Sequence, residues 1–499
     1  MKYYKYIFLS LLICVAGLFT ACSDWLDYSP KDKETEEQTF GTRQGFYTAV
    51  NGVYNRLISD VMYGKNLTWG MLDILALHYQ TPASLVYEGF SASELANYNY
   101  SNTNVADLME SIWDEAYATI LNINVILDNA ETHRGTVLSE EDYNLIRGDM
   151  LALRAFLHFD MLRMFGPVYS RDPEQLCIPY ADSREAKVYE QLSARSIIYD
   201  HLLPDLEAAE NCLHEYDPII TQGPLSTTEE GADNYTRYRQ LRLNYYATIL
   251  LKARVYLWAG DRAAALVEAR KLTDDPQVRT YFPAVDSDEL LSGSNSTPDR
   301  TFSTEILFGF YDSGRDNIYT SYFESSLTTS SLLTPRSNFV QESLFGTTSL
   351  YDYRARSQWT MSGELAYLIK YKGLELTATQ LEDGTYPFWT YFMPLMHLSE
   401  AYYIAAECLQ ETDPDAALDY MNEILATRGR QQLASGSNLL TEIQKEYMRE
   451  TWGEGQAFFL FKRLYMNITR DFNGNSTSSK TASDNNFVIP LPESELINR

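Results

Sequence analysis

Apolar residues recur three and four positions apart along much of the chain, the spacing that places side chains on one face of an α-helix. The stretches with this spacing are residues 43–58, 105–130, 143–165 and about 193–213. The pattern is strongest at 143–165, where Leu153, Leu157 and Met161 share one stripe and Gly166-Pro167 stops the helix. We expect this stripe to face a hydrophobic core.

Two later stretches predict pairs of helices joined by tight turns. They are residues 240–272, with a turn at Gly260-Asp261, and residues 395–429, with a turn at Asp413-Pro414. Asp261 is the expected N-cap of its second helix, because a short carboxylate can accept hydrogen bonds from free backbone N–H groups. The spacing of Ala253, Tyr256 and Ala265 resembles the small-aromatic-small pattern of tetratricopeptide repeats.

Residues 66–104 and 281–392 break the helical pattern. They are rich in Ser, Thr, Asn and Asp, with aromatic residues between them. Long irregular stretches inside a folded protein are usually functional or disordered, and the interleaved aromatics argue against disorder. We therefore expect an all-α, mainly helical protein, in which a helical-repeat platform (about 43–275 and 393–465) carries a loop-rich, variable region (about 281–392).

The first residues predict export. Lys2 and Lys5 precede an apolar run at 7–19, which is too short to span a membrane, and Ala21-Cys22 follows. The sequence from Phe19 to Cys22 resembles the bacterial lipobox, in which the cysteine is acylated, for example with palmitate. We expect a signal peptide (1–21), a lipidated tether (22–42) and a body (43–499). The alternative is an ordinary signal peptide followed by an incidental cysteine.

Charge and cysteine content exclude several classes of protein. Lys+Arg total 40 against 68 Asp+Glu, a formal net charge of -28, which disfavours contact with nucleic acid. The cysteines that follow Cys22 are widely spaced, at Cys177, Cys212 and Cys408. This spacing predicts neither a disulfide framework nor a zinc site, and we expect small buried hydrophobic side chains.

Sequence motifs for catalysis or metal binding are missing. The chain has no G-x-S-x-G, H-E-x-x-H or Walker A sequence. Asp471, Asn473 and Asn475 are similar to the start of a calcium loop, but Ser476 and Ala482 replace its essential Gly and Glu. We expect no cofactor, no metal and no enzymatic activity. A surface glycosidase stays an alternative, since its two carboxylates need no fixed spacing, and an adhesive surface protein is a weaker one.

Several segments together resemble the SusD/RagB family of Bacteroidetes outer-membrane nutrient-binding lipoproteins. The most specific is LRAFLHFDMLRMFGPV at 153–168. The others, in family order, are FYTAVNGVY at 46–54, residues 178–179, 195–209, 241–260 and 395–429, and the C-terminal segment from Ile489 to Asn498. These are scaffold motifs, so we interpret Arg154, Arg254 and Glu454 as partners in structural pairing between helices.

The resemblance implies a function as well as a fold. It implies tetratricopeptide-like helix pairs under a variable half. It also implies a lid on a TonB-dependent, SusC-like transporter, lipid-anchored in the outer membrane and facing the cell exterior. Such a lid captures oligosaccharides, or peptides in RagB-like relatives, and catalyses nothing.

Specificity should reside where the family motifs are missing. A sugar site needs aromatic rings beside Asn, Asp or Arg on loops that solvent reaches. Two clusters meet this description: Tyr79, Tyr98, Asn99, Tyr100 and Asn102; and Tyr311, Asp312, Arg315, Tyr319 and Tyr322. The alternative for each tyrosine is packing under a long loop.

Overall fold

The computed structural model describes residues 36–185, 187–227, 234–469 and 479–497. Cys22 and the calcium-like residues 471–476 lie outside them, so the lipidation of Cys22 and the expected absence of calcium at 471–476 stay predictions. The chain divides into two compact units, residues 1–49 and 50–499. In the first lie α2 (Glu36–Phe40) and the start of α3 (Arg43–Leu57), which confirms the helix predicted at 43–58. The second unit carries the rest of the molecule.

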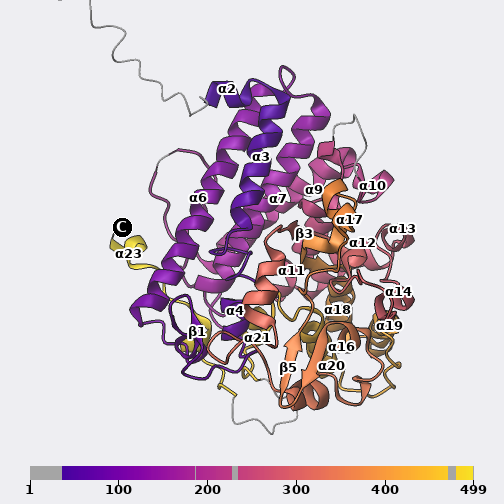
Figure 1. Cartoon of the computed structure of the whole chain (residues 1–499). Coiled ribbons are helices and arrows are strands. Elements are labelled where there is room, and N and C mark those ends of the chain that lie inside the picture. Colours follow the sequence, from indigo (N-terminus) through magenta and orange to yellow (C-terminus); the bar gives the residue numbers. More distant parts are fainter. Residues whose placement is uncertain (1–35, 186, 228–233, 470–478, 498–499) are drawn as a thin grey trace, which may run out of the picture. The chain divides into compact units, whose positions relative to one another are not determined.

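Three long helices follow the predicted hydrophobic stripes. They are α6 (Thr103–His133) and α7 (Glu140–Phe165), which pack against each other, and α9 (Leu203–Tyr216), which packs on α7 (Figure 1). The Ser139 hydroxyl caps α7 by accepting the N–H of Asp142 at 3.1 Å. Leu153, Leu157 and Met161 are fully buried, which confirms the predicted core stripe.

The two predicted hairpins are also confirmed. They are α11 (Tyr245–Trp258) with α12 (Arg262–Thr273), and α18 (Leu398–Leu409) with α19 (Pro414–Ala426). Gly260 has a φ of +78°, which suits glycine, and Asp261 accepts the N–H of Ala264 at 3.1 Å. Helix α12 packs on α18, so hairpins far apart in the sequence are neighbours in space. This row of helix pairs is the expected tetratricopeptide-like architecture.

Residues between and after the hairpins form short elements. The longer of the remaining helices are α20 (Leu439–Glu450) and α21 (Ala457–Leu464). The strands pair antiparallel as β1 (Val86–Tyr87) with β2 (Phe90–Ser91), β3 (Ile306–Tyr311) with β6 (Phe392–His397), and β4 (Trp359–Ser362) with β5 (Leu365–Leu368). The short helices include α4 (Met71–Leu75), α5 (Ala92–Ala96), α8 (Ala194–Ser196), α10 (Ile219–Gln222), α13 (Pro276–Tyr281), α14 (Ser287–Leu291), α15 (Arg315–Ile318), α16 (Tyr353–Ser357), α17 (Ala378–Asp383), α22 (Asp484–Phe487) and α23 (Glu493–Ile497). The protein is thus mainly helical.

The pair β3–β6 brings together the two ends of the loop-rich region. Tyr311 lies opposite Phe392 in this ladder, and β6 leads directly into α18. Strand β3 is buried along most of its length, from Ile306 to Phe310. The buried ladder therefore holds the loops between residues 311 and 392 against the helix pairs.

Charged residues at helix contacts pair as the sequence predicts. Arg154 on α7 binds Asp205 on α9 at 2.7 Å, and Arg254 on α11 pairs with Glu400 on α18. The prediction of structural pairing is confirmed for both arginines. Among the described residues, no helix is both long enough and apolar enough to cross a membrane.

The cysteines within the described residues are free and buried, as predicted. They are Cys177, Cys212 and Cys408. Burial raises the pKa of Cys177 to about 11 and that of Cys408 to about 12, since a thiolate is poorly solvated in the core. These thiols therefore behave as small apolar side chains rather than as nucleophiles.

Candidate functional site

Part of the first predicted cluster is buried. Tyr79 has no exposed surface, and its hydroxyl donates to the carbonyl of Trp69 at 3.0 Å. Tyr98 is 8% exposed and donates to the carbonyl of Leu75 at 2.8 Å. The expectation that solvent reaches these two tyrosines is wrong. The two tyrosine rings are packed in the core together with α4 and α5, and backbone carbonyls satisfy their hydroxyls.

The remaining members of this cluster support local structure. Asn102 caps α6, because its side-chain oxygen accepts the N–H of Asn104 at 3.0 Å. Asn99 donates to the carboxylate of Glu94 at 2.6 Å, and Tyr100 donates to the carbonyl of Asn486 at 2.8 Å. A ligand role for Asn99, Tyr100 and Asn102 stays a prediction.

The second predicted cluster lies at the end of β3 and along the two helical elements that follow it, α15 and η5 (Tyr319–Phe323). Its half-buried members, which solvent reaches, are Tyr311, Asp312, Tyr319 and Tyr322. Tyr322 packs on Trp69, with ring centroids 4.8 Å apart. The two stretches that lack family motifs, 66–104 and 281–392, therefore meet at this side chain.

Arg315 is the member of this cluster whose expected exposure is wrong. It is 2% exposed, and its Nη1 donates to the carbonyls of Trp389 at 2.8 Å and Phe392 at 3.0 Å. Burial lowers its pKa to about 10. Arg315 therefore cannot reach a ligand in this structure, but it holds the backbone of residues 389–392 in place.

The segment that Arg315 holds supplies aromatic residues that sequence reasoning missed. Tyr386 and Tyr391 are half-buried, and their rings lie 5.6 Å apart at an angle of 87°. The hydroxyl of Tyr386 lies 3.3 Å from that of Tyr311, and the rings of Tyr311 and Tyr391 are 5.5 Å apart. We call Tyr311, Tyr386 and Tyr391 the tyrosine cluster. Its signal in the sequence is the run YPFWTYF at 386–392.

Carboxyl groups lie beside the tyrosine cluster. Burial raises the pKa of Asp312, and the nearby charge of Asp60 raises it further. Burial also raises the pKa of Asp316, whose charge in turn acts on Tyr391. The apolar faces of the tyrosine rings can stack on the C–H face of a sugar. The carboxyl oxygens beside them can accept hydrogen bonds from its hydroxyls. The arrangement is therefore suited to binding a polyhydroxylated ligand.

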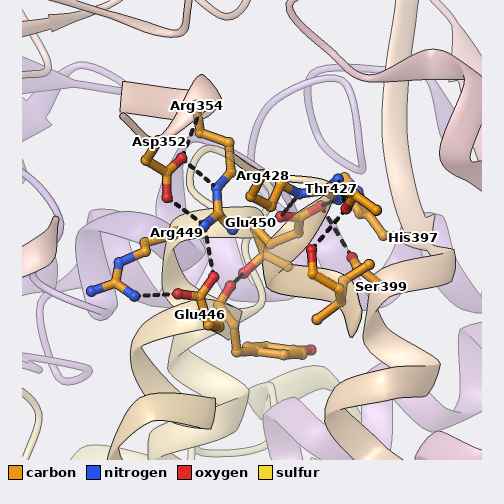
Figure 2. Close-up of polar contacts among 12 residues, drawn as sticks. Asp352, Arg354, His397, Ser399, Thr427, Arg428, Glu446, Arg449 and Glu450 are labelled. Carbon is orange, nitrogen blue, oxygen red and sulfur yellow. Dashed lines mark hydrogen bonds and ion pairs between the residues drawn. The ribbon is translucent and has the colours of Figure 1, made fainter. Parts of the chain in front are cut away.

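A second group of carboxylates lies in the core and has a different role. Glu450 on α20 accepts hydrogen bonds from Arg354 at 2.7 Å and from Ser399 at 3.1 Å, and it also pairs with Arg428 (Figure 2). Arg354 binds Glu446 as well, at 2.7 Å. We call these residues, with the partners described next, the buried charge network. It joins the loop-rich region to the helices α18 and α20.

The network extends to both sides through further pairs. Asp352 binds Arg354 at 2.8 Å, and Nε2 of His397 donates to the carboxylate of Glu454 at 2.7 Å. Lys370 also pairs with Glu454, so the predicted structural role of that glutamate is confirmed, but the pair joins two turns rather than two helices. Burial by itself lowers the pKa of His397, but the charges of Glu454 and Glu450 outweigh it and raise the pKa to about 9.

Neither a catalytic cleft nor a metal centre coincides with this network. Glu446, Glu450 and Glu454 are at most 3% exposed, so no substrate reaches them in this structure. Among the described residues, no group of His, Cys, Asp and Glu side chains is arranged to hold a metal ion. The buried charge network is therefore a packing element, and the tyrosine cluster is the better candidate for ligand binding.

Family models match both halves of the chain. Residues 24–220 match SusD-like_3, a family described as starch-binding and associating with the outer membrane. Residues 312–491 match SusD_RagB, the SusD family. The second match includes Asp312, Tyr386 and Tyr391.

Curated relatives match over part of their length. SusD-like protein P2 of Formosa agariphila is 26% identical over 218 residues, which are 43% of this chain and 38% of that protein. SusD-like protein P38 of the same organism is 24% identical over 231 residues, 45% of this chain and 41% of that protein. The aligned parts span less than half of these relatives.

Solved structures match over nearly the whole chain. A SusD superfamily protein from Bacteroides thetaiotaomicron has a TM-score of 0.67 at 20% identity, covering 91% of this chain and 98% of the other. A SusD-like carbohydrate binding protein from Bacteroides vulgatus has a TM-score of 0.65 at 18% identity, covering 91% and 96%. At these identities the likeness establishes a shared fold.

Proposed function

Because the chain belongs to the SusD/RagB family, we propose that it is a lipid-anchored nutrient-binding protein of the outer membrane that captures an oligosaccharide without cleaving it. It then delivers the ligand to a SusC-like, TonB-dependent transporter. The observation that carries the proposal is the tyrosine cluster, where half-buried aromatic rings adjoin Asp312 and Asp316. The matching family description, starch-binding and associating with the outer membrane, supports a saccharide ligand and this location.

The geometry favours binding over catalysis. A glycosidase needs one carboxyl group to donate a proton and another to act as base or nucleophile, about 5–9 Å apart across one cleft. The core carboxylates of the buried charge network are occupied by arginine, lysine and histidine. The tyrosine cluster offers flat rings and tyrosine hydroxyls, and we assign Asp312 and Asp316 beside it to hydrogen bonds with sugar hydroxyls.

Affinity measurements test the tyrosine cluster. We expect Tyr391→Ala and Tyr386→Ala to lower the affinity for the bound oligosaccharide at least tenfold, about 1.4 kcal/mol, because each removes a ring that stacks on the ligand. Calorimetry against panels of oligosaccharides and peptides measures this. Tyr351→Ala removes a ring that is 59% exposed elsewhere on the surface and is the matched control.

Three outcomes would contradict the proposal. Wild-type affinity in both folded cluster variants would exclude the tyrosine cluster as the site. Binding of peptides but of no saccharide would identify a RagB-like uptake protein. Cleaved products in the calorimetry cell would show an enzyme.

The anchor has its own test. Cys22→Ala is expected to move the protein from the membrane fraction to the soluble fraction, because acyl chains on Cys22 supply the stable attachment. Fractionation of cells and immunoblotting measure this, with Cys177→Ala as control, since Cys177 is buried in the body. If the Cys22 variant still sediments with membranes in cells that lack the transporter, lipid anchoring is wrong.

A further inference from the structure

A groove lies between the aromatic segment 386–392 on one side and α14 with the loop that follows it on the other. Its volume is about 530 Å³. It is lined by Asp288, Glu289, Ser292, Ser294, Asn295, Thr297, Pro387 and Trp389. We call it the Trp389 groove. It is large enough for one or two sugar rings, and none of its residues belongs to the tyrosine cluster.

The tryptophan in this groove is held from two directions. Its indole Nε1 donates to the carbonyl of Thr297 at 3.1 Å, and its own carbonyl accepts from Arg315 at 2.8 Å. The side chain is nevertheless half-buried rather than covered. A ring whose orientation is already set loses little conformational entropy when a ligand stacks on it.

The opposite wall is also fixed before any ligand arrives. The side-chain amide of Asn295 donates to the carbonyl of Glu289 at 2.9 Å, and its oxygen accepts the N–H of Thr297 at 2.9 Å. The hydroxyls of Ser292 and Ser294 lie 2.9 Å apart. The loop is thus braced by its own polar side chains, and it presents hydroxyl groups to the groove.

The charged side chains that line the groove are both acidic. Asp288 and Glu289 are exposed, and no arginine, lysine or histidine lines the groove. Neither carboxylate forms an ion pair within the described part of the chain, unlike most carboxylates of the core. Free carboxylates accept hydrogen bonds from hydroxyl and ammonium groups and repel carboxylates and sulfates.

From these observations we propose that the Trp389 groove is a second saccharide subsite, which takes a sugar unit without negative charge and favours an amino sugar over the matching hydroxyl sugar. The apolar face of the sugar stacks on Trp389, and its ammonium or hydroxyl groups bind Asp288 and Glu289. An ammonium group binds more tightly than a hydroxyl, because both the carboxylates and the face of the indole ring attract a cation. This inference rests on the proposed function, since it adds a subsite and a charge preference to saccharide capture.

The test uses the full-length protein in detergent with sugars that share a backbone and differ in one ionisable group. The probes are β-1,4-linked tetramers of glucosamine, glucose and glucuronate, with mannose and galactose oligomers as further neutral ligands, measured by calorimetry at pH 6. For wild type we expect the glucosamine tetramer to bind at least threefold more tightly than the glucose tetramer. We expect the glucuronate tetramer to bind at least tenfold more weakly than the glucose tetramer.

Two variants separate stacking from charge. Trp389→Ala is expected to lose at least tenfold in affinity for both neutral and amino sugars. The double variant Asp288→Asn, Glu289→Gln keeps the size of both exposed side chains, so it should fold normally. We expect it to lose the preference for the glucosamine tetramer over the glucose tetramer, because its neutral amides no longer attract an ammonium group. Tyr351→Ala again serves as the control.

The outcomes distinguish this inference from the proposed function. Saccharide binding that is unchanged in Trp389→Ala, or equal affinity for glucuronate and glucose tetramers, would overturn the groove and leave the tyrosine cluster as the site. A glucosamine preference that persists in the double variant would overturn the role of the two carboxylates. If none of the saccharides binds to the wild type, both the subsite and the proposed function are wrong.

Discussion

Replacing Glu450 with alanine is expected to destabilise the protein by about 3–5 kcal/mol, the loss seen when one partner of a buried ion pair is removed. Glu450 is 3% exposed and pairs with Arg354 and Arg428. Without it, the two guanidinium groups stay in the core with one acceptor fewer, and water cannot replace the carboxylate. The cost is therefore the desolvation of charges that have lost their partner, rather than the loss of one attractive contact.

Chemical denaturation of wild type and Glu450→Ala measures this effect. Glu411→Ala is the matched control, because Glu411 also pairs with an arginine, Arg262, at 3.0 Å, but its side chain is 68% exposed. Exposed pairs contribute about 0–1 kcal/mol, so this variant should unfold nearly as wild type does. A Glu450 variant as stable as the control would show that the buried charge network does not hold the loop-rich region to the helices.

Leu157→Ala is expected to lower the free energy of unfolding by about 2–5 kcal/mol. The substitution leaves a cavity between α7 and the helices packed on it, and those helices cannot move in to fill it. Leu157 has no exposed surface, and helix α7 packs on both α6 and α9. Gly148, one of the α7 residues that face α9, allows close contact, since a Cβ there would lie 2.6 Å from the side chain of Leu213. The helices are thus packed too tightly to move inward by much.

Thermal unfolding of Leu157→Ala, compared with that of the control variant Val267→Ala, measures this loss of stability. Val267 lies on α12, is 60% exposed and loses a similar amount of apolar side chain. Surface changes of this kind are usually within about 0.5 kcal/mol. Equal melting temperatures for the two variants would mean that the stripe of α7 does not form the core.

Long helices could be predicted because their signal is repeated. In α7 the apolar stripe covers several turns, Ser139 begins the helix and Gly166 ends it, so many residues indicate the same structure. The hairpin turn at Gly260-Asp261 was equally clear, because glycine suits the positive φ and aspartate caps the next helix. Similarity to the family motifs added the order of the helix pairs and membership of the SusD/RagB family.

The exposure of individual tyrosines could not be predicted. Tyr79 and Tyr311 both lie outside the long helices, but Tyr79 is covered by the core and Tyr311 is half-buried at the surface. A tyrosine has an apolar ring and a polar hydroxyl, so its type suits either place. Whether a tyrosine lies in the core or at the surface depends on residues far away in the sequence. For Tyr79 one of these is Phe323, whose ring centroid lies 6.1 Å from that of the tyrosine.

By itself, the sequence determined the mainly helical fold and its helix pairs, because these depend on local periodicity, caps and turns. The tertiary structure alone decided which side chains meet. It placed Tyr386 beside Tyr311, it turned Arg315 inward onto the backbone of Trp389, and it gathered Arg354, Arg428 and Glu450 in the core. These contacts join residues that lie many positions apart along the chain. Their energies come from burial and from pairing across loops, which no local pattern encodes.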